Sequence, residues 1–198
     1  MSKRLFDIAG SGVALLLLWP LMLAIAAWIK LDSPGPVLFR QDRVGRQGAL
    51  FQIHKFRSMH VHTAGQGPLI TVGADPRITR AGQFLRRTKL DELPQLWDVL
   101  VGAMSLVGPR PEVPRYVALY PAPLRDKVLS VRPGITDPAS IEYRDEATLL
   151  DRAADPERVY IEQVLPAKLR LAAHYVDHRS LIGDVRLIGA TVSRLWLH

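Results

Sequence analysis

The chain has 198 residues and a mean hydropathy of +0.07, with 48% hydrophobic and 23% charged residues. This length suits one packed unit. The apolar fraction is too high for a disordered chain and too low for a protein with many membrane spans. There is no cysteine, which excludes a disulfide framework, a thiol nucleophile and a cysteine metal site.

The net charge of +7 is concentrated in one stretch of the chain. Residues 30–90 contain 11 Lys and Arg against 3 Asp and Glu, and the remainder is close to neutral. A basic excess directly after a hydrophobic segment suits binding to anionic headgroups, phosphorylated substrates or nucleic acid. A merely solvated face is the simpler alternative. These cations are interleaved with Gly and Pro instead of following helical spacing, which favours a binding role.

The first predicted element is a hydrophobic helix over Ile8–Ile29, a stretch without any ionisable side chain. These 22 residues could cross a hydrocarbon core, which needs about 20. Pro20 predicts a bend in the middle. Lys or Arg flank both ends, whereas a spanning helix usually carries its positive excess on one side. A kinked re-entrant helix and a straight span are equally compatible with these features.

The membrane segment should end at Asp32, because the sequence Ser-Pro-Gly-Pro that follows cannot continue a helix. We therefore divide the chain into a membrane helix, residues 1–32, and a second unit, residues 33–198. In the second unit, residues 37–39 and 50–53 read as strands on either side of a Gly-containing turn, which predicts a small β-hairpin.

Residues 60–79 show no periodicity and predict a loop. Beyond them, apolar residues at helical spacing predict one helix face, formed by Leu93, Leu96, Trp97, Leu100 and Val101. Since Pro94 is tolerated only in a first helical turn, this helix should begin near Asp91. Further helices are predicted over Arg115–Leu129, broken at Pro121 and Pro123, and over Glu157–Tyr175 and Leu181–Leu197, with a turn at 132–134.

Two adjacent carboxylates, Asp91 and Glu92, stand at the predicted helix start, where the helix dipole favours negative charge and can also hold phosphate. Ordinary N-capping by Asp91 is the alternative. Cations surround the pair in sequence: Arg86, Arg87 and Lys89 precede it, and Arg110 follows between two prolines. These neighbouring cations favour a functional site over a simple helix cap.

Phosphoryl transfer is a reaction that uses both acids and cations in one site. A diphosphate substrate needs Arg or Lys side chains and a divalent ion for its charge, and a nucleophile in line with the bond that breaks. A carboxylate such as Asp91 can be that nucleophile, forming an aspartyl-phosphate. The neighbouring Glu92 would then bind Mg²⁺, which takes oxygen ligands and often only one or two carboxylates.

The order of several motifs resembles that of the bacterial sugar transferases called monotopic phosphoglycosyl transferases, and the match covers nearly the whole chain. The motifs are Lys-Arg-Leu-Phe-Asp at 3–7, the proline-broken apolar helix, Ser-Pro-Gly-Pro-Val at 33–37, His-Lys-Phe-Arg-Ser-Met at 54–59, Leu-Asp-Glu-Leu-Pro-Gln-Leu at 90–96, Ser-Leu-Val-Gly-Pro-Arg-Pro at 105–111 and Arg-Pro-Gly-Ile-Thr at 132–136. Several motifs in one order are far more specific than any single one.

The resemblance implies a reaction in two steps. Asp91 would attack the sugar-linked phosphate of a UDP-sugar, release UMP and carry the phosphosugar until a polyprenyl (undecaprenyl) phosphate takes it. Glu92 would take part in catalysis through Mg²⁺. Arg86 and Arg110, with Pro109 and Pro111 around the latter, would bind the substrate. Lys55 and Arg57 are weaker candidates for substrate contacts.

The resemblance also implies the fold: an α+β, mainly helical, monotopic membrane protein. It would have a kinked re-entrant helix at 1–32, both ends of which are cytoplasmic, and a membrane-associated catalytic domain at 33–198. That domain would contain the small β-hairpin and amphipathic helices lying at the bilayer interface. The enzyme would act at the inner leaflet of the bacterial cytoplasmic membrane, in the assembly of an exopolysaccharide, O-antigen or glycoprotein glycan.

Two other functions compete with this one. A membrane-bound nucleotide-sugar hydrolase would use the same acids with water as the acceptor. A membrane-tethered nucleic-acid-binding module would use the basic stretch 30–90, but no nucleic-acid fold pattern or aromatic stacking array accompanies it, so we expect no nucleic-acid partner. The sequence leaves open the sugar, the polyprenyl chain length, the pathway and the oligomeric state.

Overall fold

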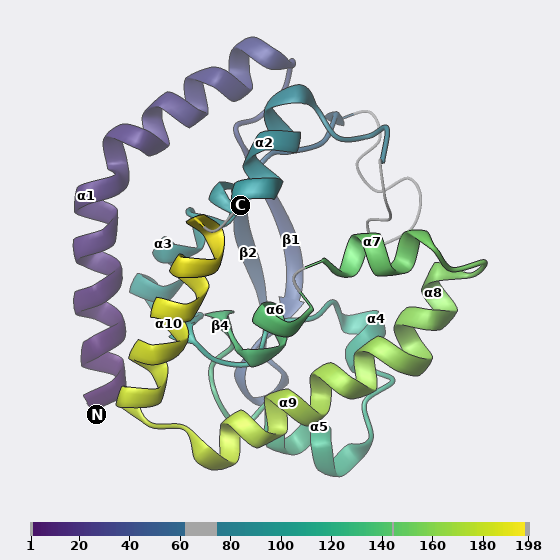
Figure 1. The fold of residues 1–198 in the computed structure, drawn as a ribbon. Coiled ribbons are helices and arrows are strands. Elements are labelled where there is room, and N and C mark those ends of the chain that lie inside the picture. Colours follow the sequence, from purple (N-terminus) through teal and green to yellow (C-terminus); the bar gives the residue numbers. More distant parts are fainter. Residues whose placement is uncertain (1, 62–74, 144, 197–198) are drawn as a thin grey trace.

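The computed structural model describes residues 2–61, 75–143 and 145–196 (Figure 1). Helices dominate and one antiparallel hairpin accompanies them, which confirms the mainly helical α+β class. The bounds are α1 Ser2–Asp32, β1 Leu38–Val44, η1 Arg46–Gly48, β2 Leu50–Phe56, α2 Arg80–Thr88, η3 Leu90–Glu92, α3 Gln95–Val101, β3 Ser105–Val107, α4 Pro114–Val117, α5 Ala122–Val128, β4 Gly134–Thr136, α6 Pro138–Glu142, α7 Glu146–Asp151, α8 Pro156–Val159, η4 Tyr160–Val164, α9 Leu165–His178 and α10 Leu181–Trp196. Most of the loop predicted at 60–79 lies outside the described residues.

Helix α1 is a long apolar helix that bends partway along its length (Figure 1). Pro20 lies within it and accounts for the bend, because proline removes a backbone hydrogen bond and crowds the preceding turn. The helix ends at Asp32, as predicted. Within the described residues it is the one helix long and apolar enough to cross a membrane. Leu16 and Leu17 expose 71% and 70% of their surface, so much of its apolar surface has no covering within the chain.

Polar contacts fasten the first turns of α1 to the rest of the protein. Lys3 Nζ lies 2.6 Å from Asp184 Oδ2 on α10. Arg4 donates to the carbonyls of Val99 and Leu100 at the end of α3, where helix carbonyls lack intrahelical partners. Asp7, which is buried, accepts hydrogen bonds from the Ser105 hydroxyl and the Leu106 N–H of β3.

The last turn of α1 is fastened to the same body. The Arg57 guanidinium donates to the carbonyls of Ser33 and Pro34 at 2.7 Å each. Asp32 accepts a hydrogen bond from the Ala81 N–H in the first turn of α2. The remaining residues therefore hold both ends of the apolar helix.

The predicted hairpin is confirmed and is longer than the sequence suggested. Strands β1 and β2 pair antiparallel over seven residues each, with Arg40 opposite His54. Gln47 in the connecting turn adopts a left-handed conformation with φ of 58°. The hairpin carries Arg43 and Lys55 toward the middle of the molecule.

The helix predicted to begin near Asp91 begins later. Lys89 adopts a left-handed conformation that ends α2, a 3₁₀ turn covers Leu90–Glu92, and the α-helix itself starts at Gln95. The prediction was wrong because this reversal takes up the residues that would have formed the first α-helical turn. Asp91 consequently does not cap an α-helix, and the argument from the dipole of a long helix does not apply to it.

The buried face of α3 also differs from the predicted one. Leu96 and Val99 are buried, whereas Trp97 and Val101 expose 54% and 56% of their surface. The physical reason is Asp98, whose carboxylate accepts from the His54 backbone N–H at 3.0 Å and pairs with His54 Nδ1 at 2.6 Å. These contacts turn the Asp98 side of the helix inward and leave part of the apolar stripe outside.

A second, parallel strand pair was not predicted. Strands β3 and β4 pair through Ser105 with Gly134 and Val107 with Thr136. The backbones approach closely just beyond, where Gly108 N–H donates to the Thr136 carbonyl and Gly134 N–H to the Pro109 carbonyl, both at 3.0 Å. This pairing places the Gly-Pro-Arg-Pro segment directly after β3 and α6 directly after β4.

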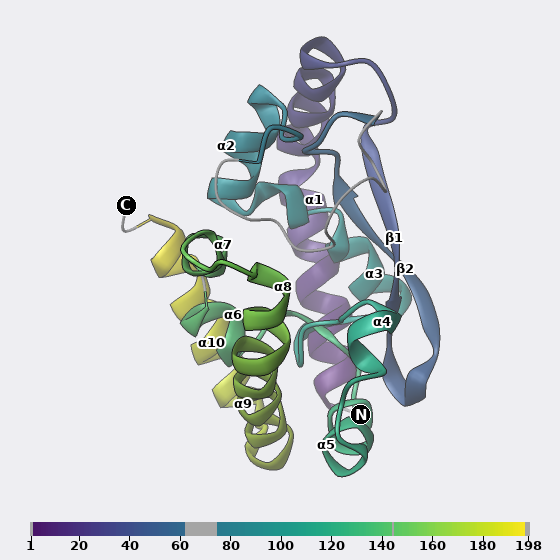
Figure 2. The same cartoon turned by 90° about the vertical axis from the view of Figure 1, so that its right-hand side faces the viewer.

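The C-terminal half of the chain supplies most of the helices that surround the β3–β4 pair, as Figure 2 shows. The break predicted at Pro121 is confirmed, since α4 ends at Val117 and α5 begins at Ala122. The break predicted at Pro123 is wrong, because Pro123 lies in the first turn of α5, where a proline is tolerated. The next predicted helix runs as α8, a π-helical turn η4 and α9. The main hydrophobic core lies here and includes Tyr116, Leu150 and Tyr160.

The close approach at Gly134 makes a testable prediction. A Cβ there would lie 2.1 Å from the Gly108 nitrogen, so Gly134→Ala must push β3 and β4 apart. We expect a loss of about 1–3 kcal/mol in the free energy of unfolding, measured by chemical denaturation in detergent. The control is Gly189→Ala on α10, where a Cβ meets no atom within 4 Å and the change should be neutral or stabilising by up to about 1 kcal/mol. Equal stability of both variants would contradict the close packing.

Candidate active site

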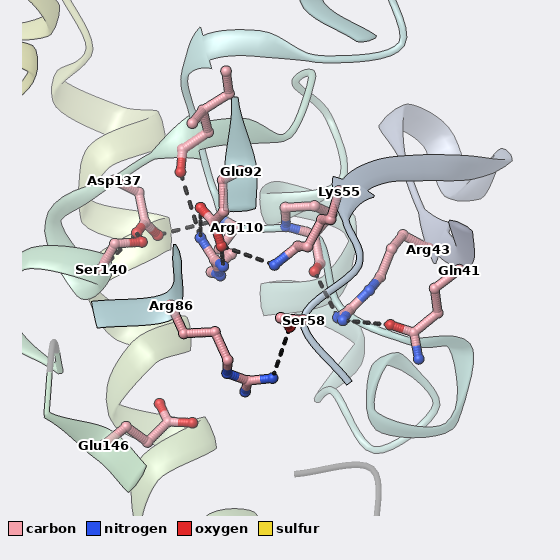
Figure 3. Close-up of polar contacts among 12 residues, drawn as sticks. Gln41, Arg43, Lys55, Ser58, Arg86, Glu92, Arg110, Asp137, Ser140 and Glu146 are labelled. Atoms are coloured by element: carbon pink, nitrogen blue, oxygen red, sulfur yellow. Dashed lines mark hydrogen bonds and ion pairs between the residues drawn. The ribbon is translucent and has the colours of Figure 1, made fainter. Parts of the chain in front are cut away.

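A cavity of about 720 Å³ lies at the centre of the molecule. Its walls come from α1, the hairpin, the segment 86–96, the Gly-Pro-Arg-Pro segment, β4, η4 and the helices α4, α6, α7, α9 and α10. Its charged lining residues are Arg43, Arg86, Lys89, Glu92, Arg110, Glu112, Glu146, Lys168 and Arg194. Figure 3 shows the side chains of Glu92 and Arg110 directed toward one another, with Arg86 and Glu146 nearby.

Glu92 is the central acid of this cluster. Its Oε1 accepts from Lys55 Nζ at 2.8 Å and from Arg110 Nη2, and its Oε2 accepts from Arg110 Nη1 at 3.2 Å. Burial opposes its ionisation, but the charges and hydrogen bonds of Arg110 and Lys55 hold the pKa of Glu92 well below its usual value. Glu92 is therefore a carboxylate at neutral pH and joins the hairpin to the Gly-Pro-Arg-Pro segment.

Arg110 is held from several sides. The charge of Glu92 raises the pKa of its guanidinium, and its Nη1 also donates to the Ile135 carbonyl at 3.4 Å. Its backbone N–H lies 3.3 Å from Asp137 Oδ2, while Asp137 Oδ1 accepts from the Ser140 N–H and so caps α6. Because Pro109 and Pro111 restrict the backbone on either side, the position of this cation is fixed by β4, α6 and η3 together.

Asp91 lies beside this cluster in a different environment. It is 7% exposed, and its Oδ1 is buried without a hydrogen-bond partner among the described residues. Burial raises the pKa of Asp91; Lys55 acts against this, and the charge of Glu92 adds to it. Asp91 does not belong to the residues that line the cavity, whereas Glu92 does. The structure thus separates the two acids into one that is firmly paired and one that is not.

Three cations border the cavity near these acids. Arg86 lies within 3.5 Å of the Ser58 hydroxyl, Lys89 sits in the left-handed turn, and Arg110 faces them. Burial and the nearby Arg110 lower the pKa of Lys89. Side chains of this kind bind phosphate oxygens, so the arrangement suits a diphosphate.

The opposite wall contains polar residues that the sequence did not single out. Glu112 accepts from the Tyr160 hydroxyl at 2.6 Å and lies 3.4 Å from Arg43 Nη1. Lys168 pairs with Glu146 and stands 5.3 Å from the centre of the Tyr160 ring. These residues are far apart in sequence and carry no local pattern, although Glu112 directly follows the Gly-Pro-Arg-Pro motif.

The remaining predicted site residues are placed differently. Lys55 contacts Glu92 but does not itself line the cavity. Arg57 donates its hydrogen bonds to carbonyls at the end of α1, so it anchors that helix and does not line the cavity either. Pro109 and Pro111 line a small separate space behind Arg110. Of the predicted substrate-binding residues, Arg86 and Arg110 line the cavity itself.

Known proteins resemble this chain over nearly its whole length. The family model described as bacterial sugar transferase matches residues 1–198. The chain is 40% identical over 98% of its length to a UDP-glucose:undecaprenyl-phosphate glucose-1-phosphate transferase of Xanthomonas campestris pv. campestris. It is 43% identical over 96% of its length to the exopolysaccharide production protein PSS of Rhizobium leguminosarum bv. phaseoli, and 38% identical over 96% to an Aeromonas hydrophila UDP-N-acetylgalactosamine-undecaprenyl-phosphate N-acetylgalactosaminephosphotransferase.

The chain belongs to the bacterial sugar transferase family. It spans 39% of the Xanthomonas relative and 42% of the Aeromonas relative, but 92% of the Rhizobium one. The Asp-Glu pair, the Gly-Pro-Arg-Pro segment and strand β2 all lie inside the matched region.

The ion cluster of Glu92, Arg110 and Lys55 predicts a pH-dependent stability. Because the pKa of Glu92 is depressed from 4.5 in the folded state, its contribution is present above that value and is lost as the pH falls through the lower, folded pKa. We expect Glu92→Gln to cost about 3 kcal/mol in the free energy of unfolding at pH 7 in metal-free buffer, and less below about pH 4. Denaturation at both pH values measures the difference.

The matched control is Glu162→Gln, which breaks an exposed pair with Arg158 on α8 and η4. That change should cost under about 1 kcal/mol at either pH. A cost of Glu92→Gln that stays the same at both pH values would contradict the depressed pKa.

Proposed function

We propose that the protein transfers a sugar-1-phosphate from a UDP-sugar to a polyprenyl phosphate and releases UMP. The observation that carries this proposal is a buried, unpaired Asp91 carboxylate next to an ionised Glu92, which lines a cavity that is cationic on one side and bordered by an apolar helix on another. The names of the Xanthomonas and Aeromonas relatives specify this reaction for UDP-glucose and UDP-N-acetylgalactosamine with undecaprenyl phosphate.

The reaction runs in two displacements at one phosphorus. An oxygen of Asp91 bonds to the sugar-linked phosphorus while the bond from that phosphorus to the bridging oxygen breaks, and UMP leaves with that oxygen. An oxygen of the polyprenyl phosphate then attacks the same phosphorus and displaces the Asp91 carboxylate. The product is a polyprenyl diphosphate sugar, and the aspartate is regenerated.

The residues around Asp91 have different roles in this reaction. Arg86, Lys89 and Arg110 border the space into which charge develops on the phosphate oxygens, and such fixed cations stabilise that charge without reorganising. Glu92 and Asp137 hold Arg110 in place. Burial leaves Asp91 poorly solvated, so its carboxylate loses little hydration when it attacks.

We further propose that Mg²⁺ takes part and that Glu92 holds it. The chemistry of the donors fits, since Glu92 is an ionised oxygen donor in the cavity wall and the buried Asp91 Oδ1 next to it has no described partner. No group of three or more acidic or His side chains forms a metal cage in the described part of the chain, so water and substrate phosphate would complete the ligand set. Bound there, the ion would neutralise charge on the diphosphate.

For the membrane helix we propose a re-entrant course with both ends at the cytoplasmic face of the inner membrane. Both ends of α1 are bound to the same folded body, through Arg4 and Asp7 at one end and Arg57 at the other. A straight span would carry one of these ends, with its buried polar contacts, across the bilayer. The bend that accompanies Pro20 also favours the re-entrant course.

The contacts of the basic stretch favour the proposed reaction over nucleic-acid binding. Several cations of the basic stretch serve internal contacts: Arg43 with Glu112, Lys55 with Glu92 and Arg57 with the end of α1. Hydrolysis of UDP-sugars differs from the proposed reaction only in the acceptor, so acceptor dependence separates the two.

The first prediction of the mechanism concerns Asp91. Asp91→Asn should abolish turnover, lowering kcat by at least about 1,000-fold, because an amide cannot act as the nucleophile. The measurement is UMP release from a panel of UDP-sugars with Mg²⁺ and undecaprenyl phosphate. Asp126→Asn, at a carboxylate that is 74% exposed on α5, is the control and should retain full activity. Full activity of Asp91→Asn would remove the mechanism, and release of many equivalents of UMP per protein without the lipid would indicate a hydrolase.

The second prediction concerns topology. Cysteine labels introduced at Ser2 and Ser180 should both be reached from the cytoplasmic side only, since both belong to the same side of the membrane in the re-entrant course. A membrane-impermeant thiol reagent applied to spheroplasts and to inverted vesicles measures this, and the native chain provides a background without cysteine. Labelling of the Ser2 position from the periplasmic side would establish a straight span.

A further inference from the structure

A stripe of small and apolar residues on α1 faces the cavity. Phe6, Gly10, Ala14 and Leu18 all line it and follow one another at intervals of four residues, which places them on one face of the helix. The neighbouring Gly12 lies elsewhere on the helix, where an added Cβ would meet no atom within 4 Å. The cavity wall therefore uses one defined face of α1.

Helix α10 provides a second apolar wall. Ile188, Thr191 and Val192, spaced as one helix face, also line the cavity. The ion pair between Lys3 and Asp184 joins the two helices at one end, and both contact β3. Figure 1 shows α10 on the same side of the molecule as the N-terminal half of α1, and Figure 2 shows the two helices set apart.

The space between these walls leads to the ion cluster. Leu93, Leu96 and Leu106 continue the apolar lining, and Glu92 and Arg110 follow directly. The cavity thus has an apolar part between a membrane helix and α10, and a charged part where Arg86 and Lys89 stand. A UDP-sugar is polar throughout and gains nothing from the apolar part, whereas an amphiphile with a phosphate head and a hydrocarbon tail matches both.

We propose that the slot between α1 and α10 binds the isoprene units nearest the phosphate of the lipid acceptor and aims that phosphate at Asp91. The inference rests on the proposed function and assigns a binding site to the lipid acceptor, the second substrate of that reaction. Helix α1 forms one wall of the slot, and its outer side exposes Leu16 and Leu17. The rest of the tail can therefore pass along this helix into the bilayer. Ala14 contributes only a methyl group to this wall, and Gly10 lets Leu106 pack closely against the helix, since an added Cβ there would lie 2.8 Å from Leu106 Cδ1.

The experiment fills the slot and follows the two half-reactions separately. In Ala14→Phe, the rate at which the phosphosugar adduct forms from a UDP-sugar without acceptor should stay within about twofold of the parent rate. Release of UMP measures this rate. Discharge of that adduct by undecaprenyl phosphate should slow about tenfold, equivalent to about 1.4 kcal/mol. Gly12→Phe is the matched control, in which the same side chain enters open space on α1 and both half-reactions should be unchanged.

A second measurement does not depend on the rates. A photoreactive benzoylphenylalanine at position 14 should crosslink to undecaprenyl phosphate in vesicles of phosphatidylglycerol and phosphatidylethanolamine, and the same group at position 12 should crosslink to bulk phospholipid. Crosslinking of position 14 to phospholipid alone would overturn the proposal. So would discharge of the Ala14→Phe adduct at the parental rate, or equal slowing of both half-reactions. If the parent protein forms no adduct, the proposed function itself fails.

Discussion

The buried contact of Glu92 with Arg110 and Lys55 is the interaction on which the rest of the site depends. It joins the hairpin, the 3₁₀ turn and the Gly-Pro-Arg-Pro segment, none of which shares a sheet or a helix with the others. A buried carboxylate is costly unless cations and hydrogen bonds compensate it, so these three elements are held together wherever Glu92 is ionised. Because Asp91 is the preceding residue, the same contact determines where the unpaired acid lies.

A second constraint is the fastening of the apolar helix. Lys3 and Arg4 reach α10 and α3, Asp7 reaches β3, and Arg57 holds the other end. Asp7 contacts the strand that immediately precedes the Gly-Pro-Arg-Pro segment. The position of the apolar helix and the position of Arg110 are therefore linked through a few short-range contacts, which suits the proposed transfer from a water-soluble donor to a lipid acceptor.

The parts of the fold that local sequence determines were predictable. The apolar helix with its end at Asp32, the hairpin around Gly45 and the helix break near Pro121 follow from composition and backbone preferences. The pairing of β3 with β4 was not, since it depends on two glycines 26 residues apart that meet only after folding. Tertiary contacts also overrode the local pattern of α3 through Asp98, and they brought Arg43, Glu112 and Tyr160 into the site without any signal in the sequence beyond the neighbourhood of Arg110.

The most direct test is to locate the phosphosugar on the protein. The purified chain is incubated with Mg²⁺ and an accepted UDP-sugar in the absence of polyprenyl phosphate, quenched and digested, and the peptides are sequenced by mass spectrometry. The account predicts one added sugar phosphate on Asp91, which disappears when undecaprenyl phosphate is supplied before the quench. A sugar phosphate on Glu92 or any other side chain, or turnover without any modified peptide, would contradict it.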